Sequence, residues 1–470
     1  MPARDLDLLL VNPATELADR GTWSREPPIG LLYIAAVLER DGFSCQIVEL
    51  SIDDRPIEEI LAILPVPLVI GFTCLTNTSN AALRLASKAR TWYKTGDPPV
   101  PIVVMGGPHA TFAHRDILAT GIVDFCFTGE VECFISRFIE IATRERDLAG
   151  IKRQVNVLGK EAFNIAFLDK MGSLVRLAGK ESFPKDLDAL PFPARYLHPI
   201  NANAGAYKTA TVVVNRGCPN QCIFCSRQAL FQRCRWRSPR NVINEIRAIH
   251  DAGHYDYYNI YDNVTVSRDF MKELLRLIIA DKALSLPWGA ELRADMIDDE
   301  AASLLRQANC KCVATGIESA DDGILRIAGK FQSIDKVQQG LAVLKEHGIP
   351  VQAYFVIGLP GETRATFEKT VAFLKASPLE PGIDKVDFFA ATPYPGSALH
   401  DRRDELGIEI LDHDFDHYDC QHLICKIPSI PMHELEAIWA EAKALETAFN
   451  SGNLKKGRQP GSNDATHSST

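Results

Sequence analysis

Three cysteines with the spacing of metal ligands stand out in this chain. Cys218, Cys222 and Cys225 form a CxxxCxxC run that follows the apolar, strand-like segment 211–214. A [4Fe–4S] cluster ordinarily takes four thiolates, one for each iron. Three thiolates would therefore leave one iron open to a small chelating ligand. The run predicts such a cluster at the edge between a strand and a loop.

A zinc site is the alternative that the cysteine spacing leaves open. Structural zinc usually takes four Cys or His ligands, and Cys234 lies close enough in sequence to be the fourth. The spacing favours the iron–sulfur cluster over zinc.

The cysteine run resembles the cluster motif of the radical S-adenosylmethionine (radical SAM) enzymes. In that family an aromatic residue precedes the third cysteine, and Phe224 fills this position. The resemblance implies that Cys218, Cys222 and Cys225 are the metal ligands and that Phe224 lies beside the cofactor. It also implies that SAM chelates the open iron, and that electron transfer cleaves SAM to release a 5′-deoxyadenosyl radical.

Composition and charge limit the partners that the chain can have. The 470 residues are 46% apolar and carry a net charge of −9, which predicts two or three domains and disfavours nucleic-acid binding. No unbroken apolar stretch reaches the roughly 20 residues of a membrane-spanning helix, and Asp5 and Asp7 stand where a signal peptide has basic residues. Twelve cysteines, three of them clustered, are typical of a reducing compartment. We therefore expect a cytoplasmic protein without membrane contacts.

Residues 1–145 alternate apolar runs with amphipathic segments. Helical patterns such as 29–40 and 77–93 separate the runs. The runs themselves are continuous, as in parallel strands buried on both faces, and lie at 6–11, 47–50, 68–72, 102–105 and 123–127. The pattern predicts a doubly wound, Rossmann-like α/β domain whose ligands lie at the carboxyl ends of the strands.

Two glycine-containing loops follow strands of this domain. Gly106-Gly107-Pro108-His109 follows Met105, and Thr128-Gly129-Glu130 follows Phe127. Paired glycines let backbone amides approach a ligand closely, although such a pair is also common in plain tight turns.

Together with segments 27–31 and 71–73, these loops resemble the cobalamin-binding domain that precedes many radical SAM cores. The resemblance implies that the corrinoid is bound by Gly106, Gly107, His109, Gly129 and Glu130. One departure concerns the loop at 12–25, where many corrinoid proteins carry a cobalt-binding histidine. This loop contains no histidine, so the lower axial ligand would not come from there. A domain that kept the fold and lost the cofactor is the alternative.

The rest of the chain divides into four parts by pattern. Proline-rich residues 146–205 predict a linker. In residues 206–400, helical patterns separate six strand candidates, which matches the partial (β/α)6 barrel that the resemblance to the radical SAM enzymes implies. The candidates lie at 211–215, 257–261, 288–292, 312–317, 351–357 and 385–390. Residues 401–450 predict a helical extension, and the polar residues 451–470 predict a disordered tail.

Active sites of such barrels lie at the carboxyl ends of the strands, which selects Glu318 and Arg293. The segment around Glu318 resembles one that reaches SAM in the family; the alternative is a helix cap. Arg293 could form a fork with the SAM carboxylate or a surface ion pair. Asp262 and Asn263 could also face SAM or substrate. No catalytic residue is assigned.

The remaining cysteines and histidines predict no second site. Buried free cysteines are usually small hydrophobes, which is our interpretation of Cys310, Cys312, Cys420 and Cys425. The stretch that contains His413, His417 and His422 is interpreted as a solvated loop rather than a metal site.

The resemblance implies a radical SAM enzyme in which the radical abstracts hydrogen from an unactivated carbon and cobalamin then delivers a methyl group. The expected partners are a small-molecule substrate and a reductase or flavodoxin-type electron donor. The alternative is radical dehydration, cyclisation or rearrangement without methyl transfer. A non-catalytic carrier fits less well, because a carrier has no use for a six-strand core around an open-iron motif.

Overall fold

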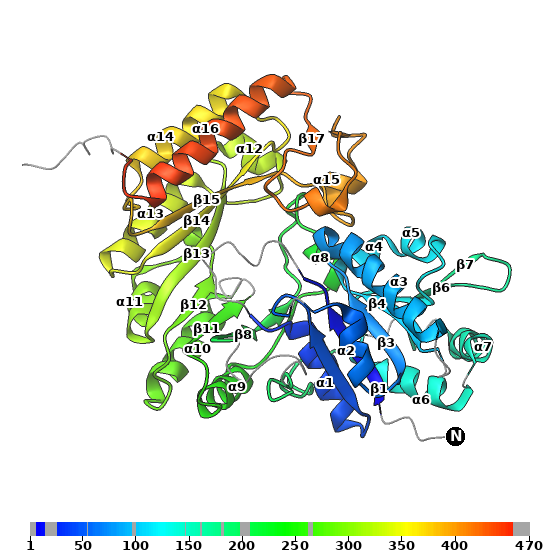
Figure 1. The fold of residues 1–470 in the computed structure, drawn as a ribbon. Coiled ribbons are helices and arrows are strands. Elements are labelled where there is room, and N and C mark those ends of the chain that lie inside the picture. The colour runs from blue at the N-terminus through cyan, green and yellow to red at the C-terminus, as the bar shows by residue number, and fades with distance from the viewer. Residues whose placement is uncertain are drawn as a thin grey trace, which may run out of the picture.

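The computed structural model describes residues 6–14, 26–53, 55–95, 100–145, 147–159, 162–179, 183–197, 207–261 and 267–454. Two sheets, each with its own helices, lie next to one another (Figure 1). Among the described residues, no helix is long and apolar enough to cross a membrane.

The first sheet has seven strands in the order β2-β1-β3-β4-β5-β6-β7. The first five in this order pair in parallel, and β6 and β7 add to the edge in antiparallel fashion. The strands are β1 (Leu6–Asn12), β2 (Cys45–Glu49), β3 (Pro67–Thr73), β4 (Ile102–Gly106), β5 (Phe125–Phe127), β6 (Asn164–Leu168) and β7 (Leu174–Ala178).

Helices cover both faces of this sheet, so the predicted doubly wound fold is confirmed. On one face, apolar residues of α1 (Ile29–Arg40), α6 (Ile135–Glu145) and α7 (Leu148–Leu158) form a core with the sheet. On the other face, α2 (Ile57–Ile63), α3 (Ser79–Thr95) and α5 (His114–Ala119) form a second core. The short α4 (Pro108–Phe112) follows β4 directly. Burial on both faces explains the continuous apolar runs of the sequence.

The expected linker at 146–205 is wrong over its first half. Residues 148–178 form α7, β6 and β7, which belong to the first sheet and its core. Residues 183–197 carry neither helix nor strand, as the prolines predict. The predicted boundary at 205/206 lies outside the described residues.

The second sheet has six parallel strands in the order β15-β14-β13-β12-β11-β8. Both β8 and β15 are edges, so the sheet is an open, partial barrel, as expected. The strands are β8 (Thr209–Val213), β11 (Tyr257–Tyr261), β12 (Trp288–Glu291), β13 (Cys310–Glu318), β14 (Val351–Ile357) and β15 (Lys385–Ala390). All six predicted strands are present.

Helices pack on one face of this sheet around a single large core. Figure 1 shows α16 (Met432–Asn450) lying along β15 and α14 (Arg364–Ala376). The other helices are α9 (Pro239–Asp251), α10 (Arg268–Ala280), α11 (Asp299–Gln307), α12 (Asp322–Ile327) and α13 (Ile334–Glu346).

The expected helical extension at 401–450 is helical only in its second half. After α15 (Ala398–Asp401) the chain forms the two-stranded pair β16 (Glu409–Ile410) and β17 (Cys425–Lys426), with a 3-10 turn at Phe415–His417 between them. This segment reaches back to the first sheet, where Asn80 donates a 2.8 Å hydrogen bond to Asp414. Of the expected disordered tail, residues 455–470 lie outside the described residues.

A buried ion triad ties segment 183–197 to the second sheet. Glu245 on α9 has no exposed surface and pairs with both Arg195 and Arg237. Arg195 also donates a hydrogen bond to the Thr211 carbonyl of β8.

Replacing Glu245 with alanine should lower the free energy of unfolding by about 3–5 kcal/mol, because two buried guanidinium groups lose their counter-charge. Urea unfolding of the purified chain measures this loss. The matched control is Glu300→Ala, whose exposed carboxylate pairs with Lys272 and Arg276. That change should cost under about 1 kcal/mol. Equal losses in the two variants would contradict a structural role for the triad.

Candidate functional site

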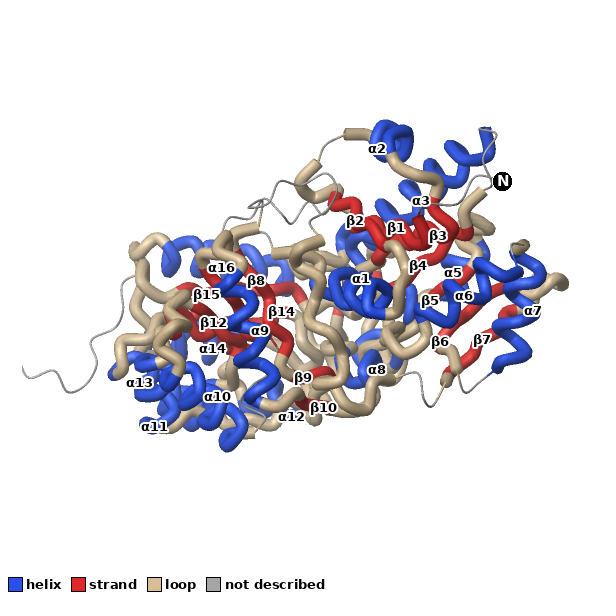
Figure 2. Tube along the Cα trace, turned by 90° about the horizontal axis from the view of Figure 1, so that it is seen from below, coloured by secondary structure: helices blue, strands red, loops and turns tan. Residues whose placement is uncertain are grey.

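The cysteine loop begins after β8 and lies between the two sheets. A short antiparallel ribbon of β9 (Asn215–Arg216) and β10 (Arg235–Trp236) encloses residues 217–234, which include α8 (Arg227–Phe231). Viewed from below, the ribbon and α8 lie between the strands of the first and second sheets (Figure 2). Gly217 has φ +87°, and a Cβ there would lie 2.4 Å from the Arg233 carbonyl oxygen. Only glycine therefore lets the two ends of the loop come this close.

Backbone contacts fix the middle of the loop against the second sheet. The Ile223 amide donates to the Ala328 carbonyl at 2.9 Å, and the Leu399 amide donates to the Ile223 carbonyl at 2.7 Å. Gly329 packs so tightly that a Cβ would lie 2.4 Å from the Gln221 carbonyl oxygen. Ile223 is therefore held between the chain that follows β13 and the chain that follows β15.

All three loop cysteines are free thiols. Burial raises the pKa of Cys222 to about 12 and also raises the pKa of Cys225. Among the described residues, no three Cys, His, Asp or Glu side chains are arranged as they stand to hold a metal ion. The donor set, three neighbouring thiols at the carboxyl ends of the strands, suits a cluster with one open iron. Their assignment as ligands stays a prediction.

Cys234 and Phe224 have other contacts. The Cys234 thiol is within hydrogen-bond distance of the Gly217 carbonyl, at 3.5 Å, and of the Asn215 side-chain Nδ2, at 3.7 Å. It therefore helps to hold the two ends of the loop together beside the ribbon. Phe224 is partly buried against the core of the second sheet, and its place beside a cofactor stays a prediction.

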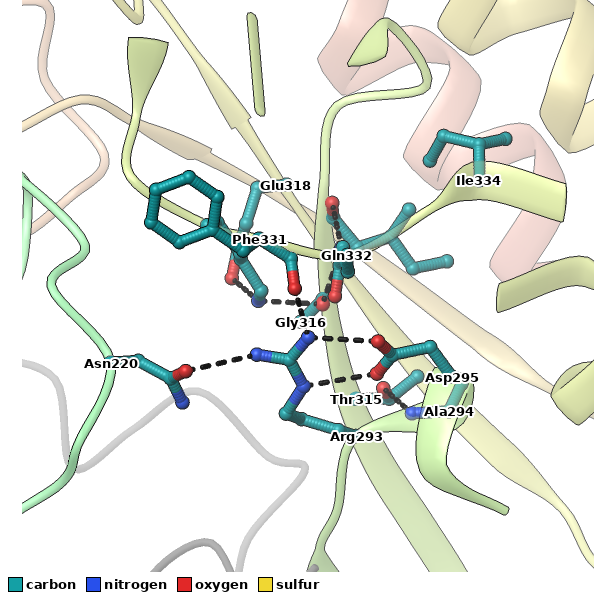
Figure 3. A network of polar contacts seen from close by, with 12 residues as sticks. Asn220, Arg293, Ala294, Asp295, Thr315, Gly316, Glu318, Phe331, Gln332 and Ile334 are labelled. Carbon is teal, nitrogen blue, oxygen red and sulfur yellow. Dashed lines mark hydrogen bonds and ion pairs between the residues drawn. The ribbon is translucent and has the colours of Figure 1, made fainter. Parts of the chain in front are cut away.

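Glu318 ends β13 in a strained conformation. Its φ is +65°, which is uncommon for a residue other than glycine, and a bulge interrupts the pairing with β14 between Gly316 and Glu318. Its carboxylate pairs with Lys330, which also donates to the Gly316 carbonyl at 2.7 Å (Figure 3). The alternative of a helix cap is wrong, because Asp321 caps α12. A SAM contact of Glu318 stays a prediction.

Arg293, which follows β12, reaches the cysteine loop. Its Nε and Nη2 form a fork with Asp295 at 2.9 and 2.8 Å, and Nη2 donates to the Phe331 carbonyl at 2.8 Å. Nη1 donates to the Asn220 Oδ1 at 3.3 Å (Figure 3). Arg293 thus forms an ion pair, as the alternative expected, but the pair is not at the surface, because the two side chains are only 12% and 8% exposed. The predicted fork with a SAM carboxylate stays a prediction, and in this structure the fork is made with Asp295.

The face of the second sheet opposite its helices is polar, and sequence analysis missed one of its residues. Tyr258 and Ile260 of β11 belong to the core, so their neighbours in the strand point to the other face. There Glu26, which precedes α1 of the first sheet, accepts hydrogen bonds from Thr211, at 2.6 Å, and from Asn259. Burial raises the pKa of Glu26 and of Glu291 at the end of β12. In the sequence, the alternation of polar and apolar residues in β11 indicates this polar face.

The glycine loops of the first sheet pack closely at its carboxyl edge. Gly107 has φ +109°, and a Cβ there would lie 2.8 Å from the Cys74 carbonyl oxygen. The Gly106 carbonyl accepts a 2.7 Å bond from the Cys74 amide, and the Gly129 amide donates to Thr111 at 2.9 Å. The structure thus brings Gly106, Gly107 and Gly129 to one edge. The loop residues 15–25 and the candidates Asp262 and Asn263 lie outside the described residues.

His109 is buried at this edge. It is 2% exposed, its Nδ1 lies 3.4 Å from the Thr76 hydroxyl, and its ring meets that of Phe415 edge-on at 4.5 Å. Burial lowers the pKa of His109 to about 4, so the ring is neutral at pH 7. The loop after β4 therefore touches the segment that follows β15.

Glu130 joins the two sheets directly. Its two carboxylate oxygens pair with Arg216, at 2.6 Å, and with Arg235. Glu132 pairs with Arg216 at 2.7 Å, and the Arg216 guanidinium lies 4.9 Å from the centre of the Tyr33 ring. The loop after β5 thus holds both strands of the ribbon that encloses the cysteine loop. A corrinoid contact of Glu130 stays a prediction.

Replacing Arg216 with alanine should loosen the cysteine loop, because Glu130 and Glu132 then lose a buried counter-charge at a cost of about 3–5 kcal/mol. Iron bound per chain after anaerobic reconstitution should fall, and proteolysis within residues 217–234 should accelerate. The control Arg233→Ala removes an exposed side chain of the same loop and should change neither. Full iron content in the Arg216 variant would show that the loop does not depend on this network.

The buried His109 predicts a loss of stability in acid. Its pKa is about 4 in the folded chain and about 6.5 when unfolded, so the unfolded chain binds more protons between these values. Stability is therefore lost as the pH falls from 6.5 towards 4, with about 1 kcal/mol lost at pH 5.5. Urea midpoints at pH 7.5 and 5.5 should differ less in His109→Gln than in the wild type. The exposed His413→Gln should keep the wild-type difference.

Two family models match this chain in succession. The model of the B12 binding domain matches residues 24–134, and the model of the Radical SAM superfamily matches residues 212–374. The first match covers most of the parallel part of the first sheet, and the second covers the cysteine loop and β11 to β14.

Several known proteins are similar over most of their length. The chain is 29% identical over 406 residues to an uncharacterized methyltransferase of Pyrococcus horikoshii, which covers 84% of this chain and 82% of that protein. It is 27% identical over 438 residues to the anaerobic magnesium-protoporphyrin IX monomethyl ester cyclase of Rubrivivax gelatinosus, with 88% and 72% covered.

The fold is similar to that of the radical SAM methyltransferase TsrM of Kitasatospora setae, solved with tryptophan substrate and a SAM analogue bound. The TM-score is 0.69 at 17% identity, and the match covers 93% of this chain and 89% of that one.

Proposed function

Because this chain belongs to the radical SAM enzymes that carry a B12-binding domain, we propose that it methylates an unactivated carbon of a small molecule. One observation supports this most. The loops at the carboxyl edge of the first sheet contact the ribbon around the cysteine loop through Glu130 and Arg216. They contact the segment after β15 through His109 and Phe415. A ligand at the carboxyl edge of the first sheet would therefore lie close to one at the carboxyl edge of the second sheet. The region where these two edges meet is called the seam below.

Each cofactor would have a defined set of residues. Cys218, Cys222 and Cys225 would hold a [4Fe–4S] cluster, with Glu318 and Arg293 near SAM. The backbone of Gly106, Gly107 and Gly129 would face the corrinoid. When bound, the cluster supplies the electron that cleaves SAM, and cobalamin supplies the methyl group. The chemistry requires both, because an sp³ carbon has no lone pair with which to attack SAM directly.

The protein environment of the seam suits radical chemistry. Arg216 and Arg235 balance the charges of Glu130 and Glu132, and none of these side chains is more than 11% exposed, so the network keeps water from one side of the cysteine loop. The neutral His109 adds no charge at the edge of the first sheet. A reductase or flavodoxin-type electron donor, a cytoplasmic location and the absence of a nucleic-acid partner are part of this proposal.

A radical reaction without methyl transfer is the second candidate. The cyclase of Rubrivivax gelatinosus is similar over 88% of this chain, so ring formation, dehydration or rearrangement would fit the same two domains. The two candidates share the cluster and SAM, and they differ in whether the corrinoid takes part.

Reconstituted chain with SAM and a low-potential reductant should release 5′-deoxyadenosine under anaerobic conditions. Cys222→Ala should abolish this product, because one iron ligand is lost. Cys234→Ala is the matched control and should retain it, since Cys234 contacts the Gly217 carbonyl at the closed end of the loop. Product from the Cys222 variant would refute the radical reaction.

The absorption spectrum of protein grown with saturating cobalamin separates the two candidates. Corrinoid bands in the purified chain support methyl transfer, and their absence would leave the second candidate in first place.

A further inference from the structure

The side chain of Asn220 lies between a cysteine of the loop and Arg293. Its Nδ2 is 3.3 Å from the Cys218 sulfur. Its Oδ1 is 3.3 Å from the Arg293 Nη1, a contact drawn in Figure 3. One short side chain thus contacts both a predicted iron ligand and a fixed positive charge.

Hydrogen-bond chemistry decides which way this amide points. The two ends of an asparagine amide are hard to tell apart by shape. Arginine, however, has donors and no acceptor, so the atom that meets Arg293 must be the amide oxygen. The NH₂ group therefore faces Cys218 and donates to its sulfur.

Arg293 is itself held in place by groups outside the cysteine loop. Its fork with Asp295 and its bond to the Phe331 carbonyl fix the plane of the guanidinium. Nη1 is thereby directed at Asn220. The orientation of the amide is set from β12 and its following turn, not from the loop alone.

We infer that Arg293, acting through Asn220, raises the reduction potential of the cluster by fixing an N–H···S hydrogen bond to Cys218. The inference rests on the proposed function in one respect, namely that Cys218 ligates the cluster. Reduction adds negative charge that is shared with the ligand sulfurs, and a hydrogen bond to such a sulfur stabilises the reduced form. Arg293 is in this sense a positioning residue, and Asn220 is the donor.

The test is the midpoint potential of the reconstituted chain without SAM or cobalamin, from redox titration followed by electron paramagnetic resonance. Asn220→Ala removes the donor and should shift the potential to a more negative value. Asn220→Asp should shift it further, because a carboxylate replaces the donor. Gln221→Ala, an exposed neighbour in the same loop, should leave the potential unchanged.

Arg293→Lys separates orientation from charge. Lysine keeps the positive charge and loses the planar fork, so the potential should again become more negative. If Arg293 acts through Asn220, the lysine change should add nothing in the Asn220→Ala background. Additive shifts of the potential in the double variant would show that Arg293 does not act through Asn220.

Two further results would overturn the inference. One is a wild-type potential in Asn220→Ala that carries full iron and sulfide. The other is weaker SAM binding in Arg293→Lys at an unchanged potential, which would assign Arg293 to the SAM carboxylate instead. The proposed function fails separately, if the wild-type chain assembles no [4Fe–4S] cluster at all. Position 293 lies outside the cysteine loop, so the Arg293→Lys variant tests the role of Arg293 even if the Asn220 variants assemble the cluster poorly.

Discussion

The buried ion network around Arg216 is the interaction on which the rest of the arrangement depends. Arg216 is 7% exposed, and burying its guanidinium without counter-charges would cost free energy. Both counter-charges, Glu130 and Glu132, follow β5 of the first sheet. Glu130 also pairs with Arg235 on the second strand of the ribbon. Since the ribbon encloses the cysteine loop, the contact between the sheets and the position of the thiols are one constraint. If the contact between the sheets or the position of the thiols changed, charged side chains of this network would be left buried without a partner.

The geometry of parallel strands explains why the candidate functional residues lie at the seam, where the carboxyl edges of the two sheets meet. Loops that follow parallel strands share an edge, and in this chain the edges of both sheets meet. The loop after β4 reaches the segment that follows β15 through His109 and Phe415. The loop after β5 reaches the ribbon that follows β8. A reaction that passes a group between two ligands requires this proximity, and the fold supplies it through contacts that carry no chemistry themselves.

Local patterns in the sequence predicted most of the fold, and they failed where distant residues decide. Continuous apolarity identified the parallel strands of the first sheet because helices cover both of its faces. Strand β6 is as apolar and as buried as the parallel strands, but it and the more exposed edge strand β7 were missed because the prolines at 183–194 dominated the pattern of that region. Glu130 was predicted as a ligand contact, but its partner Arg216 is 86 positions away. Such a pairing leaves no trace in the residues near either partner. For the same reason Glu26 was not identified.

Glu26 shows that the two domains are not separable modules. It belongs to the first domain by sequence, yet its carboxylate satisfies Thr211 and Asn259, which are 4% and 3% exposed on the strands of the second. A buried polar group without its partner costs about 1–3 kcal/mol, so the polar face of the second sheet is incomplete when the first domain is absent. Burial in turn raises the pKa of this carboxyl and of Glu291 nearby. Glu26, a residue of the domain that matches the B12-binding family, therefore completes the polar face near the cysteine loop. Its charge also contributes to the raised pKa of Glu291 on that face. The contacts of Glu26 with Thr211 and Asn259 therefore couple the stability of the second domain to the presence of the first.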